Sequence, residues 1–130
     1  MENLPDGHVV LYIDDDSVFT DVISHRLEKE GIPCLYAPSW AVAETMLAKD
    51  PLPKIILLDV TMPDVDGFEV LRRLKKNART ATIPVLMFSN NIEPEQAVHA
   101  KELGAKDYLI KVETSPGEVS NKIKEILKQA

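Results

Sequence analysis

The segment IILLDVTMPDVDG (residues 55–67) places Asp59 directly after four consecutive apolar residues. A short strand that is apolar on both faces is typical of the interior of a parallel sheet, because helices cover both faces of such a sheet. A second run of this kind, VLMF, occupies residues 85–88. The two runs predict central strands of a parallel sheet, with Asp59 at the carboxyl end of one of them.

Similar signals extend this pattern over the rest of the chain. Strands are predicted over residues 9–13, 33–37, 54–58, 84–88 and 106–110. Between them, three sets of apolar residues at helical spacing each predict one buried helix face: Val18, Phe19, Val22, Ile23 and Leu27; Phe68, Leu71 and Leu74; and Ala97, Ala100 and Leu103. Five strands alternating with five helices predict an α/β fold, a doubly wound parallel sheet with helices on both faces.

Two helix starts carry the spacing of a capping box. In this motif the first side chain and that of a Glu three positions later each accept a hydrogen bond from the other's backbone N–H. Asp66 with Glu69, and Ser115 with Glu118, have this spacing. We therefore predict that helices begin just after Asp66 and Ser115.

The bulk composition bounds the class of protein. The 130 residues, 45% of them hydrophobic, can bury a core but divide poorly into two domains, so we predict one domain over residues 1–130 with its core at about 8–129. A formal charge of −6 argues against direct nucleic-acid binding. No apolar run is long enough to cross a bilayer, so we expect no membrane insertion and a cytoplasmic location. Cys34 is predicted to be buried. Trp40 is predicted to pack its indole against the surface and is given no role; the alternative is a partly exposed contact with a partner.

Polar side chains follow four of the five predicted strands. Asp14, Asp15 and Asp16 follow the first strand, Asp59 the third, Ser89, Asn90 and Asn91 the fourth, and Lys111 the fifth. Doubly wound sheets bind ligands at the carboxyl ends of their strands. Several carboxylates in one crevice repel one another, and a raised pKa, a nearby cation or a hard metal ion such as Mg²⁺ resolves that repulsion.

This set of side chains suits phosphoryl transfer, which needs a nucleophile and positive charge near the equatorial oxygens of the transferred group. Asp59 is the best candidate for the nucleophile, because the loop after it would leave its carboxylate at the surface. The alternative is that Asp59 only caps this loop, as aspartates at strand ends commonly do. Asp14, Asp15 and Lys111 at the other strand ends favour the chemical role.

Three segments together resemble the signature segments of response-regulator receiver domains, the CheY-like superfamily. They are VLYIDDD (residues 10–16), LLDVTMPDVDG (57–67) and GAKDYLIK (104–111). The resemblance covers essentially the whole chain and is specific in order and spacing. It implies a flavodoxin-like strand order of 2-1-3-4-5 and a phosphoprotein of two-component signal transduction or a phosphorelay.

The resemblance also implies how the acidic residues act. Asp59 would accept a phosphoryl group from a phosphohistidine on a sensor histidine kinase or phosphotransfer protein. Asp15, Asp59 and the backbone carbonyl of Thr61 would bind Mg²⁺ directly, whereas Asp14 would contribute mainly through water.

Three further residues would respond to the phosphoryl group by the same resemblance. The Ser89 hydroxyl would follow the new phosphoryl oxygen, Lys111 would pair with it, and Tyr108 would turn inward. The face made by the fourth helix, the fifth strand and the fifth helix would then bind a downstream protein target differently. Since no further domain is expected after the last helix, the chain should act by binding, as a monomer or weak dimer.

Two positions depart from the family pattern. Val112 follows Lys111 where most receivers have proline, and cis peptide bonds are rare without proline, so the Lys111–Val112 bond is predicted to be trans. Asn90 stands where a small residue is usual. Together with Thr61 and Asn91, it is predicted to tune how fast water removes the phosphoryl group.

Two other functions are compatible with these residues. A degenerate receiver would keep the fold and act only as an unphosphorylated docking module. A phosphatase of the haloacid-dehalogenase type would carry a second aspartate two residues after the first, where this chain has Thr61. We therefore expect no multiple-turnover enzyme, only self-phosphorylation and slow self-hydrolysis.

Overall fold

The computed structural model describes residues 9–129 of the chain. The strands are β1 (Val10–Ile13), β2 (Cys34–Ala37), β3 (Ile55–Leu58), β4 (Val85–Ser89) and β5 (Asp107–Ile110). The helices are α1 (Ser17–Lys29), α2 (Trp40–Leu47), α3 (Gly67–Lys76), α4 (Pro94–Glu102) and α5 (Pro116–Gln129), with a 3-10 turn, η1, at Lys111–Glu113. All five predicted strands are present within one or two residues of their expected bounds. The outermost parts of the predicted domain, residues 1–8 and 130, lie outside the described residues.

The strands form one parallel sheet in the order β2-β1-β3-β4-β5, which confirms the predicted fold class. In the central strand β1, Ile13 is in register with Ala37 of β2 and with Leu58 of β3. Because β1 and β3 end level with each other, the residues that follow them, Asp14 and Asp59, emerge at the same edge. The strand order reverses at this point, where doubly wound sheets bind their ligands.

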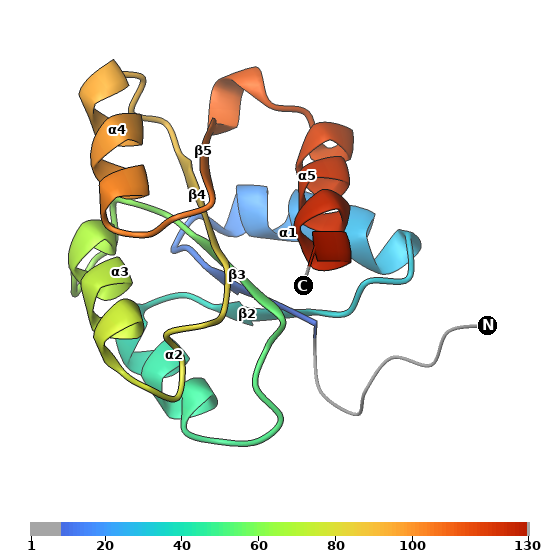
Figure 1. Cartoon of the computed structure of the whole chain (residues 1–130). Coiled ribbons are helices and arrows are strands. Elements are labelled where there is room, and N and C mark those ends of the chain that lie inside the picture. Colours follow the sequence, from blue (N-terminus) through green and yellow to red (C-terminus); the bar gives the residue numbers. More distant parts are fainter. Residues whose placement is uncertain (1–8, 130) are drawn as a thin grey trace.

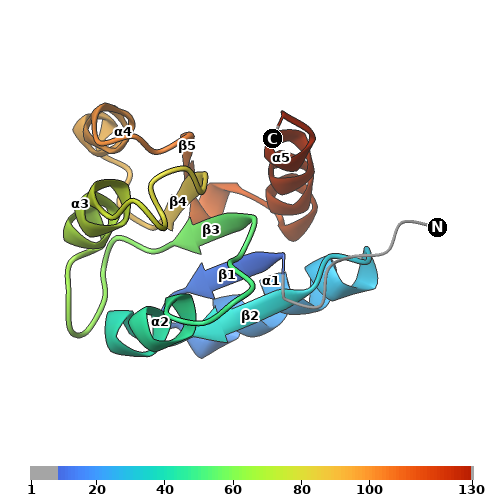
Figure 2. The same ribbon diagram turned by 60° about the horizontal axis from the view of Figure 1, so that its bottom comes forward.

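Helices cover both faces of the sheet (Figures 1 and 2). α1 and α5 lie together on one face, and α2, α3 and α4 cover the other. Side chains alternate along β1, so Leu11 and Ile13 belong to the core under α2 to α4, whereas Val10 and Tyr12 belong to the core under α1 and α5. Residues two positions apart on a strand therefore share a face, which places Tyr12 on the same side as Asp14.

One of the two predicted capping boxes is complete. At the start of α5, Glu118 accepts from the Ser115 N–H at 2.8 Å, and Ser115 Oγ accepts from the Glu118 N–H at 3.1 Å. At the start of α3, the Asp66 side chain accepts from the Phe68 N–H at 2.7 Å. The second hydrogen bond of the box, from the Asp66 N–H to the Glu69 side chain, does not form, so this prediction is wrong. Glu69 instead forms ion pairs with two arginines further along the same helix, Arg72 and Arg73.

The predicted apolar face of α1 is too wide. Ile23 and Leu27 are buried, but the side chains of Val18 and Val22 are 69% and 47% exposed. At 3.6 residues per turn, Val18 lies on the opposite side of the helix from Leu27, and Val22 lies more than a quarter turn away from it. α1 packs on the sheet and on α5 with the narrower side, which leaves the two valines in solvent.

The start of α3 packs tightly against the peptide that follows β3. The Gly67 N–H donates to the Val60 carbonyl at 2.7 Å. A methyl group on Gly67 would lie 2.2 Å from the Asp59 carbonyl oxygen and 2.6 Å from the Val60 Cα, both far inside contact distance. Glycine is therefore required at this position for helix α3 to approach the backbone of Asp59.

We predict that Gly67→Ala destabilises the protein by about 3 kcal/mol, because either α3 or the Asp59 peptide has to shift. Gly117→Ala is the matched control, since Gly117 also lies in the first turn of a helix. Its added methyl group would meet only the end of the flexible Arg26 side chain, at 3.1 Å. Urea unfolding measures both changes, and equal stabilities of the two variants would contradict the close packing at Gly67.

Candidate functional site

The polar residues that follow the strands meet in one cleft at the carboxyl edge of the sheet. The cleft has a volume of about 210 Å³ and is lined by Asp15, Asp16, Asp59, Thr61, Ser89, Asn90, Asn91 and Lys111. The residues come from four strand ends that are far apart in the sequence. Asp16 also has a structural role, because its carboxylate caps α1 by accepting from the Val18 and Phe19 N–H groups.

Three carboxylates form the acidic part of the site. One oxygen each of Asp14, Asp15 and Asp59 can be chosen so that all three lie within 4.8 Å of one another. Asp14 and Asp59 are buried, and Asp15 is exposed to solvent. Hard oxygen donors this close together, with an open side toward water, fit the coordination that Mg²⁺ prefers. The donor set of this chain therefore suits a divalent cation.

Lys111 provides the positive charge of the site. Its Nζ lies 2.6 Å from Asp14 Oδ2 and 3.6 Å from Asp59 Oδ2, and its side chain is only 4% exposed. The ammonium also lies over the Phe19 ring, 4.9 Å from the ring centroid, where the ring's electron density attracts it. One cation faces three carboxylates, so the protein alone leaves an excess of negative charge.

The excess of negative charge is one of the causes that raise the pKa of Asp59. Burial and, after it, the neighbouring charge of Asp14 together raise the pKa of Asp59 to about 7, although Lys111 opposes both effects. The ionised form of Asp59 is thus costly while the site holds no further positive charge. A cation in the cleft would lower this cost.

Asp14 is held by residues on either side of it in β1 and the following turn. Its Oδ2 accepts from the Tyr12 hydroxyl at 2.9 Å, and its Oδ1 accepts from the Asp16 N–H at 2.9 Å. Our sequence analysis gave Tyr12 no role. The signal that could have revealed it is the two-residue period of the strand, which places Tyr12 and Asp14 on the same face.

Ser89 and Tyr108 both hold the loop after β4. Ser89 Oγ accepts from the Asn91 N–H at 3.2 Å, and the Tyr108 hydroxyl donates to the Asn91 carbonyl at 2.8 Å. Tyr108 pairs in register with Met87, two residues before Ser89 on β4. Ser89 and Tyr108 therefore contact the backbone of one loop residue, Asn91, from two strands.

The peptide bond between Lys111 and Val112 is trans, as predicted. The chain continues there into the 3-10 turn η1, and Val112 is exposed. Thr114 closes the turn, because its hydroxyl donates to the Ile110 carbonyl at 2.8 Å. Lys111 itself remains buried between its carboxylate partners despite the absence of proline.

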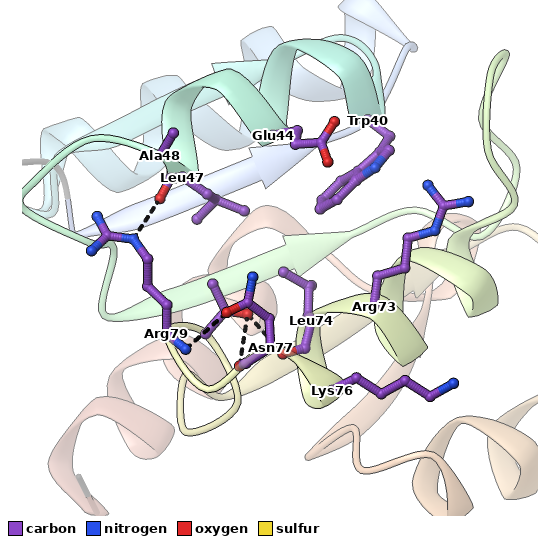
Figure 3. A pocket seen from close by; sticks show the side chains of 10 residues that line it. Trp40, Glu44, Leu47, Ala48, Arg73, Leu74, Lys76, Asn77 and Arg79 are labelled. Atoms are coloured by element: carbon purple, nitrogen blue, oxygen red, sulfur yellow. Dashed lines mark hydrogen bonds between the residues drawn. The ribbon is translucent and has the colours of Figure 1, made fainter.

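A larger hollow of about 790 Å³ lies between α2 and α3 (Figure 3). Trp40 lines it, but the prediction that its indole packs against the surface is wrong, because the side chain is part of the core and the residue is 7% exposed. The indole belongs to the same core cluster as Leu47 and Leu74, and its Nε1 has no hydrogen-bond partner. Arg79, at the other end, donates to the Leu47 carbonyl. No residue of this hollow belongs to the strand-end cleft.

Two predictions about the remaining chain can be compared with the structure. Cys34 is buried, as expected, and burial raises the pKa of its thiol to about 11. Within residues 9–129, none of the helices has the length and apolar character that crossing a bilayer requires.

Comparisons with known proteins agree with the geometry of this site. The family model of the response regulator receiver domain matches residues 10–124. Among relatives, the phosphate regulon transcriptional regulatory protein PhoB of Pseudomonas aeruginosa is 33% identical over 95% of this chain and 53% of its own length. PilH of the same organism is 33% identical over 78% of this chain and 84% of its own length. The chain thus spans about half of the first relative and most of the second.

Solved structures share the fold over nearly their whole length. A putative response regulator from Chloroflexus aurantiacus superposes with a TM-score of 0.85 at 30% identity, covering 93% of this chain and 98% of that one. The receiver domain of the Francisella response regulator 1452 superposes with a TM-score of 0.83 at 27% identity, covering 92% and 96%. The family model, these relatives and the strand-end cleft together show that the chain belongs to the response regulator receiver domain family.

Proposed function

We propose that this receiver domain accepts a phosphoryl group on Asp59 from a phosphohistidine of a sensor histidine kinase or phosphotransfer protein, and signals by binding a protein target. One observation carries the proposal: the Asp59 carboxylate faces the cleft, 3.6 Å from the ammonium of Lys111, beside two further carboxylates. Few other reactions need a carboxylate nucleophile and a fixed cation at a small acidic cleft.

In the proposed reaction, a carboxylate oxygen of Asp59 attacks the phosphorus atom of the phosphohistidine. A P–O bond to Asp59 forms as the P–N bond to the imidazole breaks, and the imidazole leaves with the electron pair of that bond. Lys111 is placed to balance charge on the phosphoryl oxygens. The hydroxyl of Ser89, at the end of β4, is a second donor at the same cleft.

Asp15, Asp59 and the backbone carbonyl of Thr61 would hold Mg²⁺ in this proposal. Asp14 would act through water, because both of its oxygens already accept hydrogen bonds or an ion pair from the protein. When bound, the cation would neutralise part of the charge on Asp59 and on the incoming phosphoryl oxygens.

The proposed output is a change in the face formed by α4, β5 and α5. Ser89 and Tyr108 hold the Asn91 peptide from two sides, so a movement of Ser89 toward a phosphoryl group would release one of these contacts. Exposed apolar side chains, Ile92 and Val98, lie on the adjoining loop and on α4. A target that prefers one packing of this face would shift the population of the two states.

We expect acetyl phosphate and Mg²⁺ to load one phosphoryl group per chain, because Asp59 lines the open cleft and its carboxylate lies 3.6 Å from the Lys111 ammonium. Asp59→Asn should abolish the loading, and Asp21→Asn, an exposed residue of α1, should leave it unchanged. Intact mass spectrometry measures the phosphorylated fraction. An unphosphorylated wild type would favour a docking module, and loading of Asp59→Asn would move the acceptor elsewhere.

The charge excess predicts a pH-dependent gain in stability for Asp59→Asn. The folded protein raises the pKa of Asp59, so ionisation of this group opposes folding; the penalty is absent below about pH 4 and complete above about pH 7. We expect the variant to be more stable than the wild type by about 2 kcal/mol at pH 8 and nearly equal at pH 4. Urea unfolding at both pH values tests this, with Asp21→Asn as the control.

Mg²⁺ should reverse the difference in stability between Asp59→Asn and the wild type at pH 8, because the cation would bind the ionised Asp59. At pH 8, Mg²⁺ is expected to stabilise the wild type and to leave Asp59→Asn nearly unchanged. A variant that is less stable than the wild type at pH 8 without Mg²⁺ would contradict the charge excess. A variant that Mg²⁺ stabilises as much as the wild type would contradict a ligand role for Asp59.

Asn90 lines the mouth of the cleft and is exposed, so its side chain narrows the approach of water to Asp59. We predict that Asn90→Ala changes the rate of phosphoryl loss severalfold, while Asn121→Ala, on the exposed side of α5, does not. The measurement follows the phosphorylated fraction over time after removal of the donor. Identical rates for the three proteins would refute a role for Asn90.

A further inference from the structure

The buried carboxylate of Asp14 has three donors from its own chain. Its Oδ1 accepts from the Asp16 N–H at 2.9 Å. Its Oδ2 accepts from the Tyr12 hydroxyl at 2.9 Å and is paired with the Lys111 ammonium at 2.6 Å. Tyr12 and Lys111 therefore share one oxygen atom of a residue that has no exposed surface.

Lys111 is placed between two anions that compete for it. Its Nζ is 2.6 Å from Asp14 and 3.6 Å from Asp59, so it favours Asp14 in this state. A phosphoryl group on Asp59 would add charge and acceptor oxygens on the far side of Lys111. Pairing with that group requires Lys111 to give up part of its contact with Asp14.

The departure of Lys111 would leave Asp14 Oδ2 without a donor if Lys111 were its only partner. A buried, charged acceptor without a donor is among the most unfavourable arrangements in a protein interior. We infer that the Tyr12 hydroxyl is the permanent donor that keeps Asp14 satisfied and so frees Lys111 to follow the phosphoryl group. The inference rests on the proposed phosphorylation of Asp59 and makes Tyr12 a positioning residue.

The surroundings of Tyr12 hold its hydroxyl in place. Tyr12 is a central-strand residue with no exposed surface, in register with Leu57 of β3 on one side. Its ring packs at a tilt on Phe88, with 6.2 Å between the centroids, and Phe88 in turn meets the edge of Phe19 at 6.0 Å. The same two phenylalanine rings lie under the Lys111 ammonium, so Tyr12 is held by burial and by Phe88 and not by its contact with the lysine's partner.

The alternative is that Tyr12 only fills the core. Tyr12→Phe separates the two roles, since it keeps the ring and removes the hydroxyl. Tyr36→Phe is the matched control, because Tyr36 is the register partner of Tyr12 on β2 and loses the same group. A role in packing predicts changes in unfolding alone, whereas a role in freeing Lys111 predicts a change in phosphoryl-analogue binding.

Calorimetric titration of Mg²⁺ alone, and then of beryllofluoride in the presence of Mg²⁺, gives the required comparison. For Tyr12→Phe we expect an affinity for beryllofluoride about tenfold weaker than that of the wild type, the scale of one hydrogen bond to a charged group. The affinity for Mg²⁺ alone should stay within about twofold. Tyr36→Phe should match the wild type in both titrations.

Equal beryllofluoride affinities in Tyr12→Phe and the wild type would overturn the inference and leave the proposed function intact. A wild type that binds no beryllofluoride would overturn both. A crystal structure of the wild type with Mg²⁺ and beryllofluoride adds a test that needs no variant. Tyr12 should still donate to Asp14 there while Lys111 contacts the fluoride, and a Lys111 that stays on Asp14 would refute the inference.

Discussion

The rest of the structure depends on the level ends of β1 and β3, which bring the carboxylates of Asp14 and Asp59 together beneath one ammonium. Ile13 of β1 is in register with Leu58 of β3, so the residues that follow them, Asp14 and Asp59, lie side by side at the edge of the sheet. Like charges at this separation inside a protein repel by several kcal/mol. Lys111, which arrives from the far edge of the sheet at the end of β5, is the compensation that the chain itself provides.

Lys111 neutralises only part of the negative charge, and the remaining charge determines what the site can bind. One ammonium for three carboxylates leaves a cleft whose oxygen donors suit a divalent cation, and in the proposed reaction that cation would also offset the charge of the incoming phosphoryl oxygens. Packing buries two of these groups: α3 approaches the backbone of Asp59 closely at Gly67, and Lys111 lies beside the rings of Phe19 and Phe88. The fold therefore holds excess negative charge at one edge of the sheet, and a bound cation would offset it.

Much of this arrangement could be predicted from the sequence, because period and position are local properties. Apolar runs predicted the strands, and the residues after them predicted the cleft. Side-chain environments that depend on packed neighbours could not be predicted: Val18 and Val22 are exposed because α1 uses a narrower face, and Trp40 is buried because its side chain joins the core between the sheet and the helices α2 to α4. Glu69 prefers nearby arginines to the helix start, and Tyr12 gains its partner only once β1 is folded.

The central claim is that carboxylates from distant strands form one divalent-cation site. Carbon-detected NMR of the aspartate carboxyl groups during a Mg²⁺ titration tests it directly. The account predicts that the signals of Asp15 and Asp59 shift together and saturate with one equivalent of Mg²⁺, whereas exposed Asp21 does not respond. Independent or unsaturated shifts of Asp15 and Asp59, or a response equal to that of Asp21, would contradict it.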